Sequence, residues 1–167
     1  QLADAISIGS TFDETLDQLN RFSALIRHLL LESGLNPSAL NIAEDIVQRS
    51  LKAIAEDDRA RWIFSASHQS PENEYALSGV LDEGIFNGVI DRTFIDEKGV
   101  RWIIDYKTAQ AADNDVEGFL DIQQAQYQEQ LARYAAMFQQ LETRPIKLAL
   151  YFPLSRAWRS WAWEGVG

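Results

Sequence analysis

The chain of 167 residues contains no cysteine. This excludes a disulfide framework, a zinc site built from thiolates and a cysteine nucleophile. No apolar run approaches the roughly 20 residues that a membrane-spanning helix needs, and the first residues do not form a signal peptide. These absences predict a protein of a reducing, cytoplasmic compartment. Because the single methionine is Met137 and the sequence opens at Gln1, we expect it to be a piece excised from a longer protein.

Positive charge is also scarce. Lysine and arginine number 15 against 25 aspartates and glutamates, which gives a formal net charge of −10. A nucleic-acid-binding domain is usually basic, because contacts of Lys and Arg with phosphate dominate its affinity. The charge therefore predicts that this chain alone binds DNA weakly at best.

The first 64 residues read as a helical part of the chain. Thr11 and Glu14 have the spacing of a capping box, and apolar residues then recur at helical intervals as far as Gly34. Asn36 and Pro37 restart a second amphipathic helix, which continues to the acidic residues 56–58. Residues 59–64 are ambiguous between a turn and a short helix.

Residues 65–167 read as a core of strands and helices. A polar loop over 65–73 precedes a strand over 74–81, and a hairpin follows over 89–107. A long helix over 117–141 then separates this hairpin from an apolar strand over 147–152, and a last strand is expected within 156–164. The residues expected on the buried face of this helix are Tyr127, Leu131, Tyr134, Phe138 and Leu141. A helical crossover of this kind allows parallel pairing of the strands that it joins. The pattern predicts one α/β (α+β) domain, in which helices flank a central mixed sheet that contains an antiparallel hairpin.

The hairpin at residues 89–107 carries the most informative side chains. A three-residue loop over 97–99, with Gly99 in the left-handed conformation, would pair Asp96 with Val100. In that register Asp91 lies directly opposite Asp105. Since side chains alternate along a strand, two sets are predicted on opposite faces. One holds Asp91, Ile103, Asp105 and Lys107; the other holds Ile90, Phe94, Trp102, Ile104 and Tyr106.

Two opposed carboxylates need a compensating partner. Directly opposed residues lie roughly 4.5–5.5 Å apart at Cβ, and like charges there destabilise a sheet. Either one carboxyl stays protonated or a cation lies between the two. Lys107 supplies one positive charge on the same face, and a hard divalent cation, which prefers carboxylate oxygen, would supply two. The alternative is a solvated outer face on which Asp and Lys are simply exposed.

Three short motifs in order carry a family resemblance. The segments 88–91 (Gly-Val-Ile-Asp), 105–108 (Asp-Tyr-Lys-Thr) and 130–134 (Gln-Leu-Ala-Arg-Tyr) resemble the signature of RecB-family nucleases of the PD-(D/E)XK superfamily. Such domains lie at the C-terminal end of RecB-type and AddA-type helicase–nucleases. The resemblance implies a restriction-endonuclease-like core over residues 65–167.

The resemblance also implies roles for single residues. Asp91 matches the first metal-binding aspartate, and Asp105 and Lys107 match the D-x-K pair, in which the lysine orients the attacking water or stabilises charge on phosphorus. Glu74, or failing that Glu72, would complete the metal site, together with the backbone carbonyl of Tyr106.

Gln130 and Tyr134 match the Q-x-x-x-Y motif, whose helix helps to place the DNA strand. Without the resemblance these two residues would read as an ordinary polar pair at the edge of a helix.

The implied activity is hydrolysis of DNA phosphodiester bonds by an exonuclease that uses Mg²⁺ or Mn²⁺. The implied partners are single-stranded DNA ends, helicase domains of the same parent chain and, as a further possibility, a partner helicase–nuclease subunit. The resemblance also implies that no membrane takes part and that the setting is DNA repair and recombination in the bacterial cytoplasm.

One element of the family pattern is missing from this sequence. RecB-family nucleases usually carry a histidine on a helix upstream of the first acidic strand, whereas this chain has only His28 and His68, neither in the expected context. We therefore expect the motif histidine to precede Gln1, which would leave the site impaired.

Two other classes of function stay open: a catalytically inactive module that guides DNA or supports structure, and an acidic domain that binds a protein. The intact set of Asp91, Asp105 and Lys107 argues against an inactive copy.

Overall fold

The structure is a computed structural model that describes residues 37–81, 84–110 and 115–165. It divides into two compact units, residues 1–66 and 67–167, which are described separately below. The predicted helix over residues 11–34, with His28, lies outside the described residues. None of the described helices is both long enough and apolar enough to cross a membrane.

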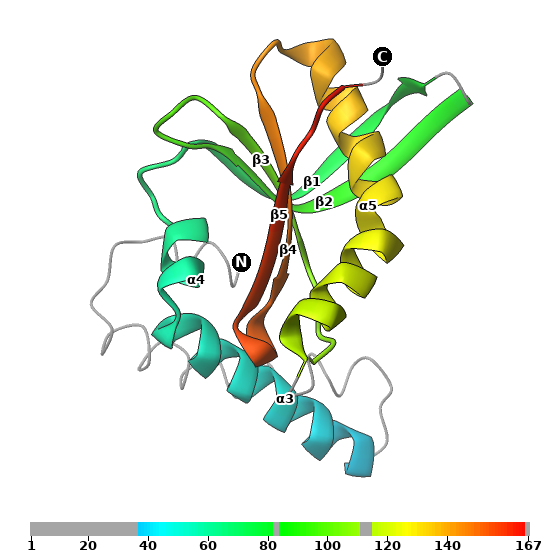
Figure 1. Cartoon of the computed structure of the whole chain (residues 1–167). Helices are drawn as coiled ribbons and strands as arrows, with labels where there is room; N and C mark the ends of the chain where they lie inside the picture. The colour runs from blue at the N-terminus through cyan, green and yellow to red at the C-terminus, as the bar shows by residue number, and fades with distance from the viewer. Residues whose placement is uncertain (1–36, 82–83, 111–114, 166–167) are drawn as a thin grey trace. The chain divides into compact units, whose positions relative to one another are not determined.

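The first unit contains two described helices, α3 (Pro37–Glu56) and α4 (Asp58–Ile63) (Figure 1). Pro37 begins α3, as expected for a residue whose fixed φ suits the first helical turn and whose missing N–H costs no hydrogen bond there. The carboxylate of Asp57 caps α4 by accepting a hydrogen bond from the backbone N–H of Arg59 at 2.9 Å. The ambiguous stretch 59–64 is therefore helical as far as Ile63.

The second unit is built on one five-stranded sheet. Its strands lie in chain order across the sheet, and β3 and β4 pair in parallel while the other neighbours are antiparallel. Helix α5 (Val116–Leu141) forms the crossover between β3 and β4, as predicted. This mixed sheet with its crossover helix, in a chain that also has described helices before it, confirms the predicted α+β class and is consistent with a restriction-endonuclease-like fold. The strands are β1 (Gln69–Leu81), β2 (Gly84–Ile95), β3 (Arg101–Tyr106), β4 (Ile146–Phe152) and β5 (Ala157–Ala162), and the 3₁₀ turn η1 (Pro153–Ser155) joins the last two.

Strand β1 begins earlier than its polar sequence indicated. The predicted loop over 65–73 was wrong for its second half, because Gln69 already pairs with Ile95 of β2. The register shifts between Gln69 and Glu72, and Pro71 lies within this irregular stretch. Proline is tolerated at such a place, since β1 is an edge strand and its outer N–H groups have no sheet partner.

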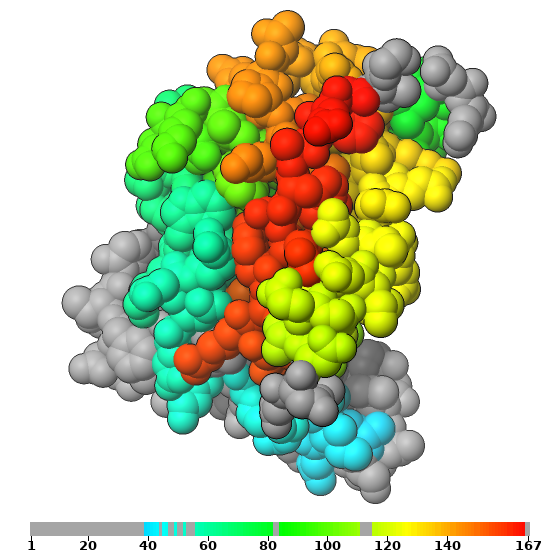
Figure 2. Space-filling view, viewed as in Figure 1, coloured from blue at the N-terminus to red at the C-terminus, as the bar shows by residue number. Residues whose placement is uncertain are grey.

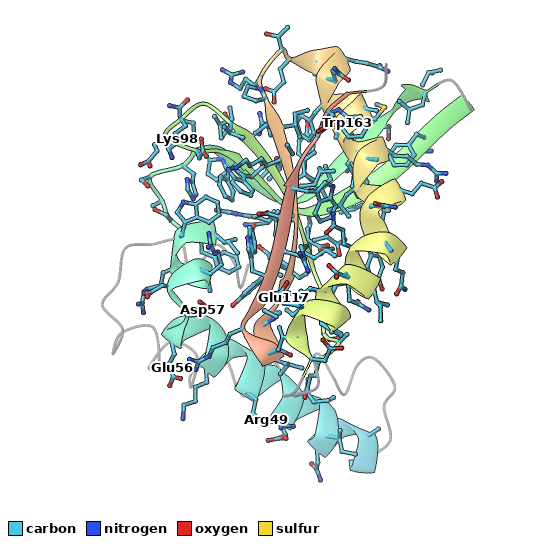
Figure 3. All side chains as sticks on the ribbon, in the orientation of Figure 1. Arg49, Glu56, Asp57, Lys98, Glu117 and Trp163 are labelled. Carbon is cyan, nitrogen blue, oxygen red and sulfur yellow. The ribbon has the colours of Figure 1, made fainter. Side chains whose placement is uncertain are left out.

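The turn between β2 and β3, in which Figure 3 labels Lys98, has the predicted form. The N–H of Asp96 donates to the carbonyl of Val100 and the N–H of Gly99 donates to the carbonyl of Asp96, both at 3.0 Å, while Gly99 has φ +76°. Burial alone would raise the pKa of the Asp96 carboxyl. Hydrogen bonds from the indole of Trp102 and from the backbone N–H groups of Val100 and Lys98 outweigh burial and lower this pKa. The register of the ladder that follows, from Ile95↔Arg101 to Arg92↔Ile104, is also the predicted one.

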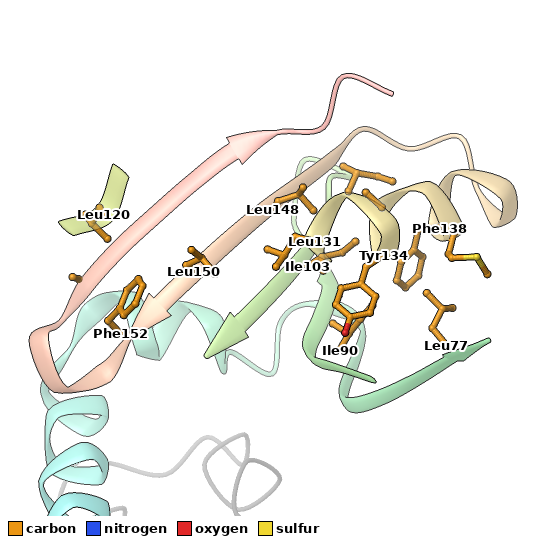
Figure 4. Close-up of a cluster of buried hydrophobic side chains, with 14 residues drawn as sticks. Leu77, Ile90, Ile103, Leu120, Leu131, Tyr134, Phe138, Leu148, Leu150 and Phe152 are labelled. Atoms are coloured by element: carbon orange, nitrogen blue, oxygen red, sulfur yellow. The ribbon is translucent and has the colours of Figure 1, made fainter. Parts of the chain in front are cut away.

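The core of this unit lies between α5 and the sheet (Figure 4). Leu131, Tyr134 and Phe138 of α5 are buried in one cluster with residues of the central strands such as Ile103 and Leu148. Three of the predicted apolar positions of α5 are thus confirmed as buried and Tyr127 is partly buried. The fifth prediction, Leu141, was wrong: this last residue of the helix is 65% exposed.

Helix α5 and the edge strand β5 lie side by side on the face shown in Figure 2. Arg159 of β5 joins them through ion pairs with Glu117 and Asp121 in the first two turns of the helix, at 3.1 and 2.8 Å. These contacts attach the N-terminal end of α5 to the sheet.

Ile90 departs from the predicted alternation. It belongs to the same buried cluster as Ile103, although the two were expected on opposite faces of the hairpin. The ladder between β2 and β3 ends at Arg92↔Ile104, so Ile90 has no partner on β3 and pairs instead with Tyr75 of β1. Glu74, the residue before Tyr75 on β1, has φ +49°. Next to this irregularity, the side chains of the three strands no longer alternate strictly between the two faces of the sheet.

Candidate active site

The two aspartates of the predicted site lie just beyond the last pair that β2 and β3 form with each other. Arg92 and Ile104 form the last pair of this ladder. Asp91 comes directly before Arg92 in β2, and Asp105 comes directly after Ile104 in β3. The backbone N–H of Tyr106 donates a 2.7 Å hydrogen bond to Oδ2 of Asp91, which ties the first aspartate to the strand of the second. Asp105 itself is paired in register with Leu150 of β4, so it lies in the middle of the sheet.

Lys107 is anchored at its backbone and at its ammonium group. Its N–H donates to the carbonyl of Tyr151 on β4 at 2.9 Å. Its Nζ lies 2.6 Å from Oδ2 of Asp105, and the two side chains are 20% and 10% exposed. The distance is that of an ion pair, yet this buried oxygen has no partner with hydrogen-bond geometry among the described residues. Asp105 therefore keeps unused capacity to accept a hydrogen bond or to bind a cation.

Tyr127 of α5 supplies the second contact of Lys107. The ammonium nitrogen lies 3.8 Å from the centroid of the Tyr127 ring. The sequence placed Tyr127 in the buried stripe of the helix but did not connect it with the lysine. The available signal was its position seven residues, or two helical turns, before Tyr134, because residues so spaced share one face of a helix.

The environment of Asp91 disfavours its negative charge. Burial raises the pKa of its carboxyl most, and the charges of Asp105 and Glu74 raise it further. The hydrogen bond from Tyr106 and the charge of Lys107 act in the opposite direction without cancelling the effect. A raised pKa at a carboxylate beside a second carboxylate is the electrostatic condition that a bound cation relieves.

Two of the predicted ligands, Asp91 and Asp105, therefore fit a site for a hard divalent cation. Asp91 and Asp105 would offer carboxylate oxygen, which such ions prefer. In the part of the chain that the structure describes, no group of three or more histidine, aspartate or glutamate residues is arranged to hold a metal. Glu74 is exposed and acts on Asp91 through its charge, while Glu72 lies opposite Thr93 and is also exposed. The ligand roles of Glu74 and of the Tyr106 carbonyl stay predictions.

The Q-x-x-x-Y pair of α5 holds β2 close to Asp91. Tyr134 is 6% exposed, and its hydroxyl donates to the carbonyl of Val89 at 3.0 Å. Nε2 of Gln130 donates to the same hydroxyl at 3.2 Å. A side chain at Gly88 would overlap the Tyr134 ring, so glycine is needed for this close approach. The contacts position the backbone two residues before Asp91, and a direct contact of Gln130 or Tyr134 with DNA stays a prediction.

His68 has a structural environment. Its ring stacks on Phe94 with the centroids 3.8 Å apart and the planes 8° from parallel, and it is buried. His68 directly precedes β1, which pairs with β2, and it therefore lies beside Phe94 of β2.

No curated protein matches the chain. The sequence model of the PD-(D/E)XK nuclease superfamily matches residues 1–159 of the 167, which includes both aspartates, Lys107 and α5. Given this match over nearly the whole sequence and a D-x-K pair beside Asp91 where the β2–β3 ladder ends, the chain belongs to the PD-(D/E)XK nuclease superfamily.

Proposed function

We propose that this chain hydrolyses the phosphodiester bonds of DNA with the aid of Mg²⁺ or Mn²⁺. Members of its superfamily are nucleases. The observation that carries the proposal is the convergence of Asp91, Asp105 and Lys107 where the β2–β3 ladder ends. There the pKa of the Asp91 carboxyl is raised, and the Asp105 carboxylate forms an ion pair with Lys107.

Each of the three residues has a distinct part in this reaction. Asp91 and Asp105 would hold the divalent cation, which when bound polarises the phosphate and lowers the pKa of water. Tyr106 keeps Asp91 oriented through its backbone N–H. Lys107 places a positive charge beside Asp105, where it can orient the attacking water or stabilise the negative charge that develops on the phosphate oxygens.

The finer assignment rests on the three motifs. Their resemblance to RecB-family nucleases supports an exonuclease that acts on single-stranded ends as the C-terminal domain of a helicase–nuclease in DNA repair and recombination. The net charge of −10 is compatible with this arrangement, because helicase domains of the same chain would capture the DNA. The division into a helical part over residues 1–64 and a nuclease core over 65–167 belongs to the same proposal.

Thermal unfolding with and without millimolar Mn²⁺ or Mg²⁺ tests the cation site directly. A ligand that binds the folded state stabilises it by mass action, by about 2.7 kcal/mol at 100 times its dissociation constant. We expect the cation to raise the midpoint of the wild-type protein and to leave Asp105→Asn nearly unchanged. Cleavage of a single-stranded oligonucleotide is then measured under the same conditions.

Asp96→Asn is the matched control for this experiment. Like Asp105→Asn, this substitution removes the negative charge of a buried aspartate. The carboxylate of Asp96, however, accepts its hydrogen bonds within the β2–β3 hairpin, from Lys98, Val100 and Trp102. The variant should keep the full response to the cation whatever its own stability. Stabilisation of the wild type without cleavage would indicate an inactive cation-binding module. An absent response would contradict the proposal and favour an acidic domain that binds a protein.

A further inference from the structure

The ammonium group of Lys107 lies between two partners of different chemistry. On one side is the carboxylate of Asp105, at 2.6 Å, and on the other is the ring of Tyr127, whose centroid lies at 3.8 Å. Cations within about 6 Å of an aromatic centroid are attracted by the negative face of the ring, more strongly where water is excluded. The Lys107 side chain is 20% exposed, so this contact is largely withdrawn from solvent.

We propose that Tyr127 is a positioning residue for Lys107: its ring holds the ammonium group in place for the reaction assigned to this site. The inference rests on the proposed function and adds a residue to it.

The ring is a rigid platform because its helix is fixed on both sides of it. Tyr127 packs against the buried core cluster. Two turns further along α5, the hydroxyl of Tyr134 is bound to the carbonyl of Val89. Toward the start of the helix, Asp121 is paired with Arg159 of β5. These contacts fix the backbone of α5 on the sheet, and the packing of Tyr127 against the core cluster restricts rotation of its ring.

The lysine is held equally well at its other end. Its backbone N–H is bound to Tyr151 of β4, so the start of the side chain is fixed by the sheet. A lysine has four rotatable side-chain bonds and loses considerable rotamer freedom when it is ordered. A contact at the ammonium group, together with this backbone anchor, selects few of the possible conformations before substrate arrives.

Asp105 alone cannot serve this purpose in the proposed reaction. Its oxygens are also the donors assigned to the cation, and the oxygen nearest to Lys107 lacks hydrogen-bond geometry. The Tyr127 ring is not among the oxygen donors of the site. It therefore gives Lys107 a contact that does not depend on how Asp105 is engaged.

The competing explanation is that Tyr127 only fills space in the core. Two substitutions separate the explanations. Tyr127→Phe keeps the ring and its charge distribution, whereas Tyr127→Leu keeps an apolar side chain of moderate size and removes the ring. Phe119→Leu is the matched control, because it removes another partly buried ring of α5, one that packs on Phe152 with a centroid distance of 5.0 Å.

The first readout is the proton chemical shift of the lysine CεH₂ groups in protein labelled at lysine. The chain has four lysines, Lys52, Lys98, Lys107 and Lys147, so the spectrum is simple. Protons above a ring are shifted upfield. We expect an upfield Lys107 signal in the wild type, Tyr127→Phe and Phe119→Leu, and a signal near those of Lys52 and Lys98 in Tyr127→Leu. A Lys107 signal that does not change on loss of the Tyr127 ring would overturn the proposal.

The second readout is cleavage of an oligonucleotide in Mn²⁺. We expect kcat to fall about tenfold in Tyr127→Leu, which corresponds to about 1.4 kcal/mol in the activation barrier. Tyr127→Phe and Phe119→Leu should retain the wild-type kcat, and KM should change little, because Tyr127 contacts the lysine and not the DNA.

Equal kcat values for Tyr127→Leu and the wild type would also overturn the proposal. If the wild type itself does not cleave, the proposed function fails instead, and the chemical shift still reports whether Tyr127 holds the lysine.

Discussion

Two buried ion pairs that involve residues of β3 differ in their hydrogen-bond geometry. Arg101 donates from Nε and Nη2 to the two oxygens of Glu142, at 2.7 and 3.1 Å, and its guanidinium lies over the ring of Phe138. Asp105 meets Lys107 through one short contact without hydrogen-bond geometry. A bidentate pair with satisfied donors has a structural role. Among the described residues, Asp105 has one ion-pair partner where Glu142 has two, Arg101 and Arg144, so its carboxylate retains lone pairs with which it could bind the proposed cation.

The Arg101–Glu142 pair should make stability depend on pH. The hydrogen bond from Arg101 is the main reason that the pKa of Glu142 lies below its ordinary value of 4.5. A carboxyl with a lowered pKa in the folded state stabilises the protein fully above that ordinary value. The contribution is lost as the pH falls through the folded-state pKa, because the unfolded chain binds the proton more readily.

Urea unfolding of wild type and Glu142→Gln at pH 7, 5 and 3 measures this contribution. At pH 7 the substitution should lower the free energy of unfolding by about 1.5–3 kcal/mol, the range for hydrogen bonds to charged groups. The difference should shrink toward pH 3. Glu129→Gln is the control, since its pair with Arg133 is on the surface and should contribute little at any pH. A constant difference between wild type and Glu142→Gln at all three pH values would contradict the assignment.

Among the elements, α5 has the largest influence on the site. It contacts Lys107 through Tyr127, and it supports the β1–β2 hairpin through Tyr134 at the Val89 carbonyl and through Gln140 at the Val80 carbonyl, the latter at 3.2 Å. The hairpin can approach the helix closely because glycines lie at the points of contact. A Cβ at Gly88 would overlap the Tyr134 ring, and a Cβ at Gly79 would overlap the terminal methyl of Met137.

These two glycines should differ in their response to alanine. The neighbour of Gly88 is the Tyr134 ring, which is held by a hydrogen bond and by the core, and Phe86 also lies 3.1 Å from the added carbon. Gly88→Ala should therefore lower the free energy of unfolding by about 1–3 kcal/mol, as overpacking does. Gly79→Ala should cost less, because the end of the Met137 side chain is flexible.

Urea unfolding of the two variants, with cleavage as a second measurement, checks this difference. Gly88→Ala should also reduce cleavage, since it displaces the β2 backbone three residues before Asp91. Equal losses of stability in the two variants would show that Tyr134 can move aside and that it does not fix β2.

At the scale of the whole molecule, the net charge of −10 restricts the contact with DNA. Several cations of the second unit are already paired with acidic residues, among them Arg101, Arg159 and Lys107. In the described part of the second unit, these pairings reduce the number of positive groups available to replace the counterions of a nucleic acid. If the chain acts as proposed, it should depend on the proposed cation and on helicase domains of the parent chain to approach a phosphate.

Binding of a labelled single-stranded oligonucleotide, followed by fluorescence anisotropy at several salt concentrations, tests this expectation. For single strands the logarithm of the association constant falls with the logarithm of the salt concentration by about 0.7 per phosphate neutralised. With no more than about three phosphates contacted, the slope should be no steeper than about −2. A slope near −5 would reveal a basic surface that the formal charge conceals.

Local rules account for much of this architecture. The Asp96–Val100 closure, the left-handed Gly99 and the β2–β3 register follow from turn chemistry and two-residue alternation, which act over a few residues. The helix over residues 116–141 and its parallel crossover follow from apolar spacing and chain connectivity in the same way.

Pairing on β1 follows less well from these rules. Polar residues 69–73 carry no strand signal, and they are strand because β2 offers them partners. The positive φ of Glu74 and the position of Ile90 depend on where the ladders end, which is set by three strands together.

The sequence by itself determined the sheet order near the hairpin and the adjacency of Asp91 and Asp105, because neighbouring strands joined by a tight turn have little choice of register. Only the tertiary structure decided which groups surround these aspartates. The contact of Tyr127 with Lys107 spans 20 residues and that of Tyr134 with Val89 spans 45. Such contacts depend on how α5 lies on the sheet, and that is settled by packing of the whole core and not by any pattern along the chain.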